Sequence, residues 1–308
     1  MRLRILDIDG SLPVQPGVAA ALAEGRAQRI DLRDEERTLR LWATRRRMRR
    51  LAARLDALAP PPGSGPLVTL YGSGDYHHLA TALMAAVAEP FTVIHFDNHP
   101  DWVRVPATHN CGGWVNRALE LPRVGRVVTL GVCSDDLVHP QAKTGNVAAL
   151  ASGRLEIHAW RALPSRVWGR IGDGPGHRQA GRRLVWTCLA GQDWPAFLDR
   201  LLARLPTDAV WVTIDKDVLR PADAATNWDQ GEMPLEALLT ALKRLAAARR
   251  VVGVDVCGEY SPPRFSDPLK RLAAWFDHPR AAPSPPDALA RNDRTNRALV
   301  ETLAAVLP

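Results

Sequence analysis

The stretch FTVIHFDNHPD, at residues 91–101, decides the fold class. Its first six residues form a short apolar run without alternation, which is typical of a strand buried on both faces of a sheet. Similar runs follow along the chain, at 67–71, 126–132, 209–214 and 251–256. Amphipathic helical patterns lie between several of them, at 77–89, 195–204 and 234–249. Buried strands that alternate with helices predict a three-layer α/β/α fold around a central, mostly parallel sheet.

Acidic and histidine side chains follow these runs. Asp97, His99 and Asp101 come after the run at 91–96, and Asp215 and Asp217 come after the run at 209–214. The carboxyl ends of parallel strands meet at one edge of the sheet, where open α/β folds bind ligands. We therefore expect these side chains to converge in one crevice. Alternate residues of an extended chain point the same way, so Lys216 should point away from its two acidic neighbours.

Carboxylates that converge in this way need a cation. Four of them at one place would repel one another, and two divalent ions would balance their charge. A donor set made mostly of oxygen, with one or two imidazoles, suits Mn²⁺ better than it suits a closed, cysteine-rich zinc site. The alternative without a functional role is that these side chains are helix caps and surface carboxylates. The pairing of Asp-x-His with Asp-x-Asp at strand ends favours two Mn²⁺ ions per chain.

Composition excludes several other classes of protein. The chain has 308 residues, is 46% hydrophobic and 24% charged, and carries a net charge of +7. Only four of its 40 basic residues are lysines, so the charge indicates a compositional preference for arginine, and we expect no nucleic-acid partner. No apolar run reaches the roughly 18 residues of a membrane span. Acidic residues in the first apolar stretch argue against a signal peptide, and four separated cysteines favour reduced thiols in the cytoplasm.

Three segments together resemble the ureohydrolase superfamily of arginases, agmatinases and formiminoglutamases. They are VIHFDNHPD at 93–101, VWVTIDKDVLRP at 210–221 and GVDVCGEYSPP at 253–263, and the resemblance covers roughly residues 66–265. It implies a single arginase-like domain over residues 1–308, cytoplasmic and assembled as a trimer or hexamer. Within this domain we expect three parts: an N-terminal strand and arginine-rich helix in 1–65, the metal-site core in 66–265, and a C-terminal loop and helix in 266–308.

The resemblance also implies a ligand set. Asp97 and Asp215 would bridge two Mn²⁺ ions, Asp101 and an upstream histidine would complete one ion, and His99 and Asp217 would complete the other. The upstream histidine is either His77 or its neighbour His78. Because His77 lies closer to the family's usual position, it is the preferred ligand.

The implied reaction is cleavage of a C–N bond in a guanidino, amidino or formimino compound. A hydroxide that bridges the metals, oriented by Asp101, would attack the electrophilic carbon. Glu259 matches the carboxylate that contacts the cationic C–N group, and His109 is the candidate proton shuttle, with Cys111 as an alternative side chain near the substrate. The family's contacts to an amino acid's α-groups find no match here, which argues against arginine as the substrate.

Three other interpretations stay open from the sequence. A zinc deacetylase on the same fold would use one ion, the pair His77 and His78, and Tyr260 to polarise a carbonyl. A phosphatase of the haloacid dehalogenase type would use Asp7 and Asp9. A protein that binds metal without catalysis is the third. Metal stoichiometry and the effect of single Asp→Asn changes separate these interpretations.

Overall fold

The computed structural model describes residues 1–308 except 60, 62–63, 106–107, 266 and 278–286. Residues 278–286 belong to the loop predicted within 266–308, so that part of the prediction lies outside the described residues.

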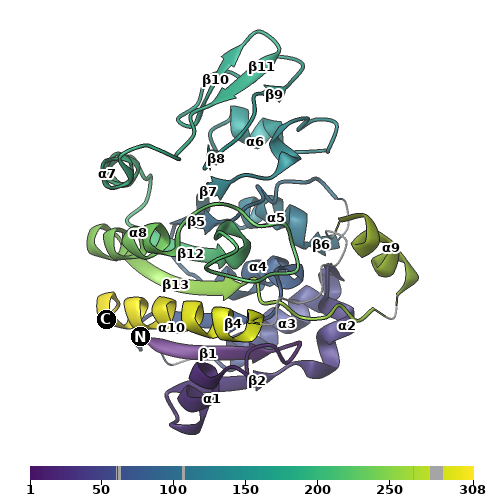
Figure 1. The fold of residues 1–308 in the computed structure, drawn as a ribbon, viewed down its shortest axis with the longest axis vertical. Helices are drawn as coiled ribbons and strands as arrows, with labels where there is room; N and C mark the ends of the chain where they lie inside the picture. Colours follow the sequence, from purple (N-terminus) through teal and green to yellow (C-terminus); the bar gives the residue numbers. More distant parts are fainter. Residues whose placement is uncertain (60, 62–63, 106–107, 266, 278–286) are drawn as a thin grey trace.

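An eight-stranded sheet forms the centre of the molecule (Figure 1). All of its neighbouring strands run parallel, in the order β2-β1-β4-β13-β12-β5-β7-β8. The strands are β1 (Arg2–Asp7), β2 (Ala27–Asp31), β4 (Leu67–Tyr71), β5 (Phe91–Phe96), β7 (Val124–Val132), β8 (Leu155–Ala159), β12 (Ala209–Asp215) and β13 (Arg250–Cys257). The predicted class, three-layer α/β/α with a parallel sheet, is confirmed.

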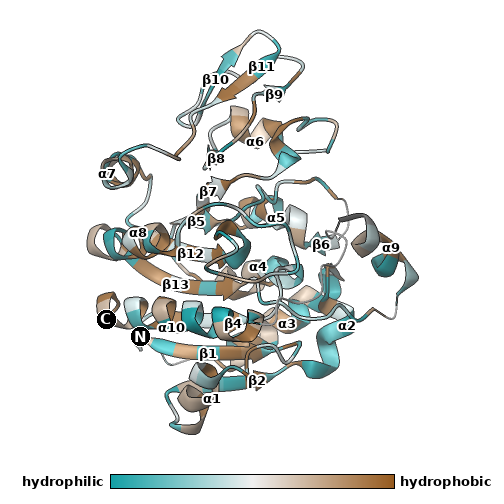
Figure 2. Ribbon diagram, in the orientation of Figure 1, coloured by the Kyte–Doolittle hydropathy of each residue, from teal (hydrophilic) through white to brown (hydrophobic). Residues whose placement is uncertain are grey.

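Helices cover both faces of this sheet (Figure 1). One layer contains α1 (Pro16–Ala23), α7 (Trp194–Ala203), α8 (Leu235–Ala248) and α10 (Ala288–Val306), which pack on one another. The other contains α3 (Arg45–Ala57), α4 (Ala80–Met84) and α5 (Trp114–Glu120). The shorter helices are α2 (Glu36–Leu39), α6 (Val147–Ala151) and α9 (Pro268–Asp277). The brown colour of Figure 2 follows the central strands, because they are apolar on both faces.

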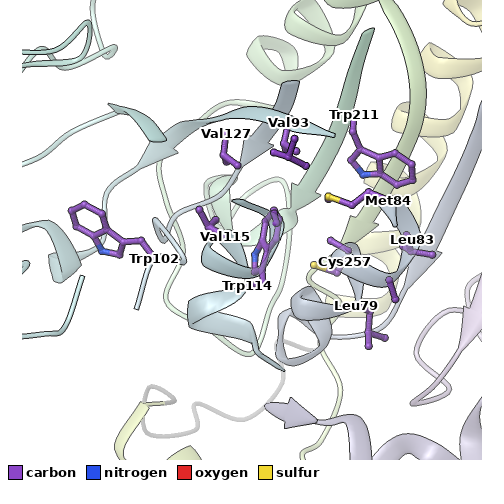
Figure 3. Packing of buried hydrophobic residues seen from close by; sticks show 14 of the residues in the cluster. Leu79, Leu83, Met84, Val93, Trp102, Trp114, Val115, Val127, Trp211 and Cys257 are labelled. Carbon is purple, nitrogen blue, oxygen red and sulfur yellow. The ribbon is translucent and has the colours of Figure 1, made fainter. Parts of the chain in front are cut away.

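Successive side chains of the central strands point to opposite faces of the sheet and pack in two separate apolar cores. On β12, Trp211 packs in the core beneath α3, α4 and α5, while Val210 and Val212 pack in the core beneath α7, α8 and α10. Figure 3 shows the first core, where Trp211 and Met84 lie close to Leu83 and Cys257. The two cores hold the central strands rigidly, so the residues at their carboxyl ends are fixed in position.

The structure differs from the sequence pattern in several places. The arginine-rich helix begins only at Arg45, because β3 (Trp42–Thr44) pairs with β6 (Thr108–Asn110) just before it. The irregular segment around 160–195 contains a small antiparallel sheet of β9 (Ser165–Arg166), β10 (His177–Ala180) and β11 (Arg183–Trp186). The edge strands β2 and β8 were not predicted, because their polar residues interrupt the apolar runs by which the other strands were recognised. Among the described helices, none combines the length and apolar character needed to cross a membrane.

Candidate metal centre

A cleft of about 710 Å³ opens at the carboxyl edge of the central strands. Asp97 follows β5, Asp215 ends the neighbouring strand β12, and Asp217 lies one turn further, in the 3-10 helix η5 (Lys216–Val218). His99 and Asp101 complete the predicted residues that line the cleft. Side chains that lie far apart in the sequence therefore meet where the sequence analysis expected them.

Asp97 lies at the centre of this cluster. Its Oδ2 is 3.0 Å from His77 Nδ1, and its Oδ1 is 3.5 Å from His99 Nδ1. The donor atoms form three overlapping groups, namely His77, His95, Asp97 and Asp101; Asp97, His99 and Asp217; and His77, Asp215 and Cys257. Asp97 belongs to two of them, so one carboxylate faces two candidate ion positions.

The environment of His77 fixes which of its nitrogens faces the carboxylates of Asp97 and Asp101. His77 lies on the 3-10 helix η2 (Gly74–Leu79), and its Nε2 is 2.9 Å from Thr213 Oγ1. Thr213 donates its own proton to Asp255, 2.8 Å away, so the His77 Nε2–H must donate to Thr213. The other ring nitrogen, Nδ1, lies 3.0 Å from one carboxylate oxygen and 3.3 Å from another, those of Asp97 and Asp101.

This nitrogen is buried and has no hydrogen-bond partner of good geometry among the described residues. Against the effect of burial, Cys257 and the carboxylates of Asp101 and Asp97 raise the pKa of His77, so Nδ1 attracts a cation, either a proton or a metal ion. A histidine that donates one N–H to a fixed partner and aims the other nitrogen at carboxylates is the usual arrangement of a metal ligand.

His99 repeats this arrangement on the other side of Asp97. Its Nε2 lies 3.0 Å from Asp229 Oδ1, and its Nδ1 lies 2.9 Å from Asp217 Oδ2. Asp229 is itself fixed by the amide of Asn98, which donates to its Oδ2 at 3.0 Å. The tautomer that donates to Asp229 presents Nδ1 to the predicted ligands.

His95 supports Asp97 from inside β5. Burial lowers the pKa of His95 to about 4, so the ring is neutral at pH 7. Its Nε2 lies 2.7 Å from Asp97 Oδ2, and its Nδ1 lies 3.0 Å from Thr129 Oγ1. The neutral ring fixes Asp97 without adding a charge. The sequence analysis missed His95, although its place two residues before Asp97 puts both side chains on one face of the strand.

Asp101 adopts a strained conformation at the rim of the cluster. Its φ of 45° is left-handed, which is uncommon for a residue with a β-carbon. Trp114 Nε1 donates to Asp101 Oδ2 at 2.7 Å and holds the carboxylate towards His77. Burial, and then the negative charge of Asp97, raises the pKa of Asp101 to about 8. Strain of this kind persists where the surrounding structure enforces it, as at functional sites.

Burial and mutual repulsion also raise the pKa values of the two carboxylates on the β12 side. Burial raises the pKa of Asp217, and the neighbouring charge of Asp215 adds to the effect. The pKa of Asp215 is raised by burial and by Asp97. The backbone packs closely here, since a β-carbon on Gly258 would lie 2.4 Å from Asp215 Oδ1. Buried carboxylates that destabilise one another in this way are stabilised by a bound divalent ion.

The residues fit divalent metal ions by distance as well as by chemistry. Nitrogen and oxygen donors that share one ion at about 2.0–2.2 Å lie roughly 3.0–3.5 Å apart. His77 Nδ1 lies 3.0, 3.3 and 3.7 Å from oxygens of Asp97, Asp101 and Asp215. The cluster can therefore hold metal ions without a large rearrangement.

Glu259 does not line the cleft. It is buried behind the cluster, where it accepts a hydrogen bond from Lys216 Nζ, one from Gln15 Nε2 at 2.8 Å and one from Asn296 Nδ2 at 2.7 Å. Lys216, which the sequence analysis expected to point away from its acidic neighbours, forms a buried salt bridge with Glu259. Gly258, directly before it, adopts a left-handed conformation with φ of 90°.

The structure also leaves His109 outside the cleft. His109 lies on β6, with Nδ1 3.5 Å from Thr81 Oγ1, and burial together with Arg117 lowers its pKa to about 4. Its neighbours Asn110 and Cys111 line the cleft instead. His78 does not join the candidate ligand groups, and both of its ring nitrogens are buried without a hydrogen-bond partner among the described residues.

The residues of the rival interpretations lie elsewhere. Asp7 pairs with Arg29 at 2.5 Å, and Asp9 accepts hydrogen bonds from Ser11 and Ser261. Tyr260 is not among the described residues that line the cleft. Asp229, which lines the cleft, is a residue that the sequence analysis missed, because its loop carries no periodic pattern.

Comparisons with known proteins extend this description. No family model matches the chain. An uncharacterised protein of Thermotoga maritima is 28% identical over 198 residues, which are 64% of this chain and about 60% of that relative's length. The arginase of Bacillus cereus has a similar structure, with a TM-score of 0.60 and 15% identity over 98% of each chain. The proclavaminate amidino hydrolase of Streptomyces clavuligerus has a TM-score of 0.52 and 14% identity, over 96% of this chain and 92% of that one.

These likenesses confirm the predicted resemblance for the fold. They extend over almost the whole chain, including the segments outside the three motifs. Sequence identity is low throughout, so what these likenesses show is a shared architecture. The chain thus has the fold of the arginases and amidino hydrolases, with a buried cluster of histidine and aspartate at the carboxyl edge of its sheet.

Proposed function

We propose that the chain is a metal-dependent hydrolase of the ureohydrolase type, with two Mn²⁺ ions in the cleft. One observation carries this proposal. The Nδ1 atoms of His77 and His99 face opposite oxygens of the shared carboxylate of Asp97. Asp101 and Asp215 would complete the first ion with His77, while Asp217 and Asp215 would complete the second with His99.

Two bound ions would supply a hydroxide at neutral pH and would polarise the reacting group. The chain's own residues orient these partners. Thr213 and Asp229 set the tautomers of the two histidines. Asp101, which Trp114 holds at the rim, would orient the attacking water and accept its proton.

The substrate would be a small guanidino, amidino or formimino compound, cleaved at a C–N bond. Its cationic group needs a carboxylate in the cleft, and Glu259 is committed to Lys216. Asp229 lines the cleft with a half-exposed carboxylate, so it is the better candidate for this contact.

Metal analysis and hydrolysis assays test the proposal together. We expect about two Mn²⁺ per chain after reconstitution and release of urea, an amide or ammonia from at least one compound of these classes. Asp215→Asn should abolish turnover, whereas Asp7→Asn, a change away from the cleft, should not. One zinc per chain with amide hydrolysis would favour the deacetylase instead. Phosphatase activity that is lost in Asp7→Asn would favour the phosphatase of the haloacid dehalogenase type.

Metal binding without hydrolysis over the whole panel would favour a binding protein. The trimer or hexamer implied by the resemblance stays a prediction, which light scattering of the purified protein checks.

A further inference from the structure

Cys257 lies beside the proposed metal centre. It ends β13, next to Asp215 on the neighbouring strand, and 1% of its surface is exposed. Its Sγ lies 3.3 Å from Asp215 Oδ2. Together with His77 these residues form a group whose donor atoms all lie within 4.8 Å of one another.

We propose that Cys257 is a thiolate ligand of the ion held by His77 and Asp215, which makes this position selective for a softer divalent ion than Mn²⁺. The inference rests on the two-ion site of the proposed function: excess Mn²⁺ fills both positions, but the position beside Cys257 binds a softer ion more tightly. The other position, with Asp97, His99 and Asp217, offers no sulfur among the described residues.

Distances support a shared ion. Zinc binds thiolate sulfur at about 2.3 Å and carboxylate oxygen at about 2.0–2.2 Å, so two such donors on a tetrahedral ion lie roughly 3.6 Å apart. The separations are 3.3 Å from Cys257 Sγ to Asp215 Oδ2 and 3.7 Å from His77 Nδ1 to the same oxygen. Asp215 can therefore share one ion with either side chain after small shifts, and the donor atoms of all three lie within 4.8 Å of one another.

A second observation also points to a ligand here. His77 Nδ1 is buried, has no hydrogen-bond partner among the described residues, and is aimed at the carboxylates of the same group. In Figure 3 Cys257 lies within the apolar core, near Leu79 and Leu83. A buried thiol in such a core commonly serves as a small apolar side chain. This one instead directs its S–H to a predicted metal ligand.

The polarisability of the thiolate sulfur determines which metal ion this position prefers. Thiolate favours zinc and cobalt over manganese, whereas carboxylates and water suit manganese. When an ion binds, the proton that Cys257 shares with Asp215 is released to water, and the sulfur takes its place on the ion. The two positions would then differ, with a soft ion beside Cys257 and a hard ion beside Asp217.

Cobalt spectroscopy tests this assignment without an activity assay. Metal-free protein is titrated with Co²⁺ while its absorption is followed. We expect two equivalents to bind, and one of them to produce a thiolate-to-cobalt charge-transfer band in the near ultraviolet. Cys257→Ser should lose this band. Cys133→Ser is the matched control and should keep it, because Cys133 lies at the same sheet edge after β7 and donates to Gly131 O.

Zinc affinity provides a second measurement. Chelator competition measures the zinc affinity of each variant. Loss of a residue that only supports a metal ligand costs roughly 10- to 100-fold in affinity, so Cys257→Ser, which removes a ligand, should lose at least this much at one position. Manganese affinity should change less. Two bound Co²⁺ ions without a charge-transfer band in the unaltered protein would overturn the role of Cys257 and leave the metal centre intact. Failure to bind any Co²⁺ would overturn the proposed function as well.

Discussion

Replacement of Glu259 by glutamine should destabilise the protein strongly, because it leaves the Lys216 ammonium buried without its carboxylate. Both side chains are almost completely buried, with 0% and 2% of the residue surface exposed for Lys216 and Glu259. Removal of one partner from a buried pair costs about 3–5 kcal/mol. With a urea dependence of about 3 kcal/mol per molar, the unfolding midpoint should fall by roughly 1–1.7 M.

The assay is urea unfolding of metal-free protein, followed by circular dichroism. The matched control is Glu89→Gln, which breaks an ion pair with Arg250 whose side chains are about half exposed, and it should cost at most about 1 kcal/mol. The double variant Lys216→Met/Glu259→Leu should recover most of the loss, since apolar replacement of a buried pair is often neutral. A Glu259→Gln midpoint equal to that of the control would refute the reasoning.

Three further perturbations test other parts of the structure. Asp229→Ala removes the acceptor of His99 Nε2 and should weaken metal binding by about 10- to 100-fold, measured by chelator competition. Thr213→Val removes the acceptor that fixes the His77 tautomer and should weaken binding similarly; unchanged affinity would contradict the tautomer argument. The pKa of Glu156 is lowered to about 2, since hydrogen bonds from His158 and Arg204 outweigh the effect of burial. Its stabilisation, about 3 kcal/mol, is present above pH 4.5 and lost as the pH falls towards 2, so Glu156→Gln should flatten urea midpoints measured across that range.

The sequence predicted the sheet and its ligand-bearing edge because both follow from local periodicity. Short apolar runs such as FTVIHF are typical of strands in a doubly covered sheet, and residues directly after such strands, like Asp97 and Asp215, share its carboxyl edge. Side chains one loop further away were harder to place. The orientation of Glu259 depends on the left-handed Gly258, and the position of Asp229 depends on contacts across the cleft. Neither leaves a periodic signal in the sequence.

The parallel order of the sheet also governs when the cluster can form during folding. Parallel pairing requires distant segments to meet first, and the ligand loops are likewise brought together from afar, with Asn98 and Asp217 in hydrogen-bond contact although 119 residues separate them. Short fragments or early compact states cannot assemble such a cluster, and its carboxylates repel until a cation arrives. Divalent ions that bind only the completed sheet would favour the folded state by mass action. The supply of metal would then set the lifetime of the folded chain against unfolding and proteolysis, independently of any turnover.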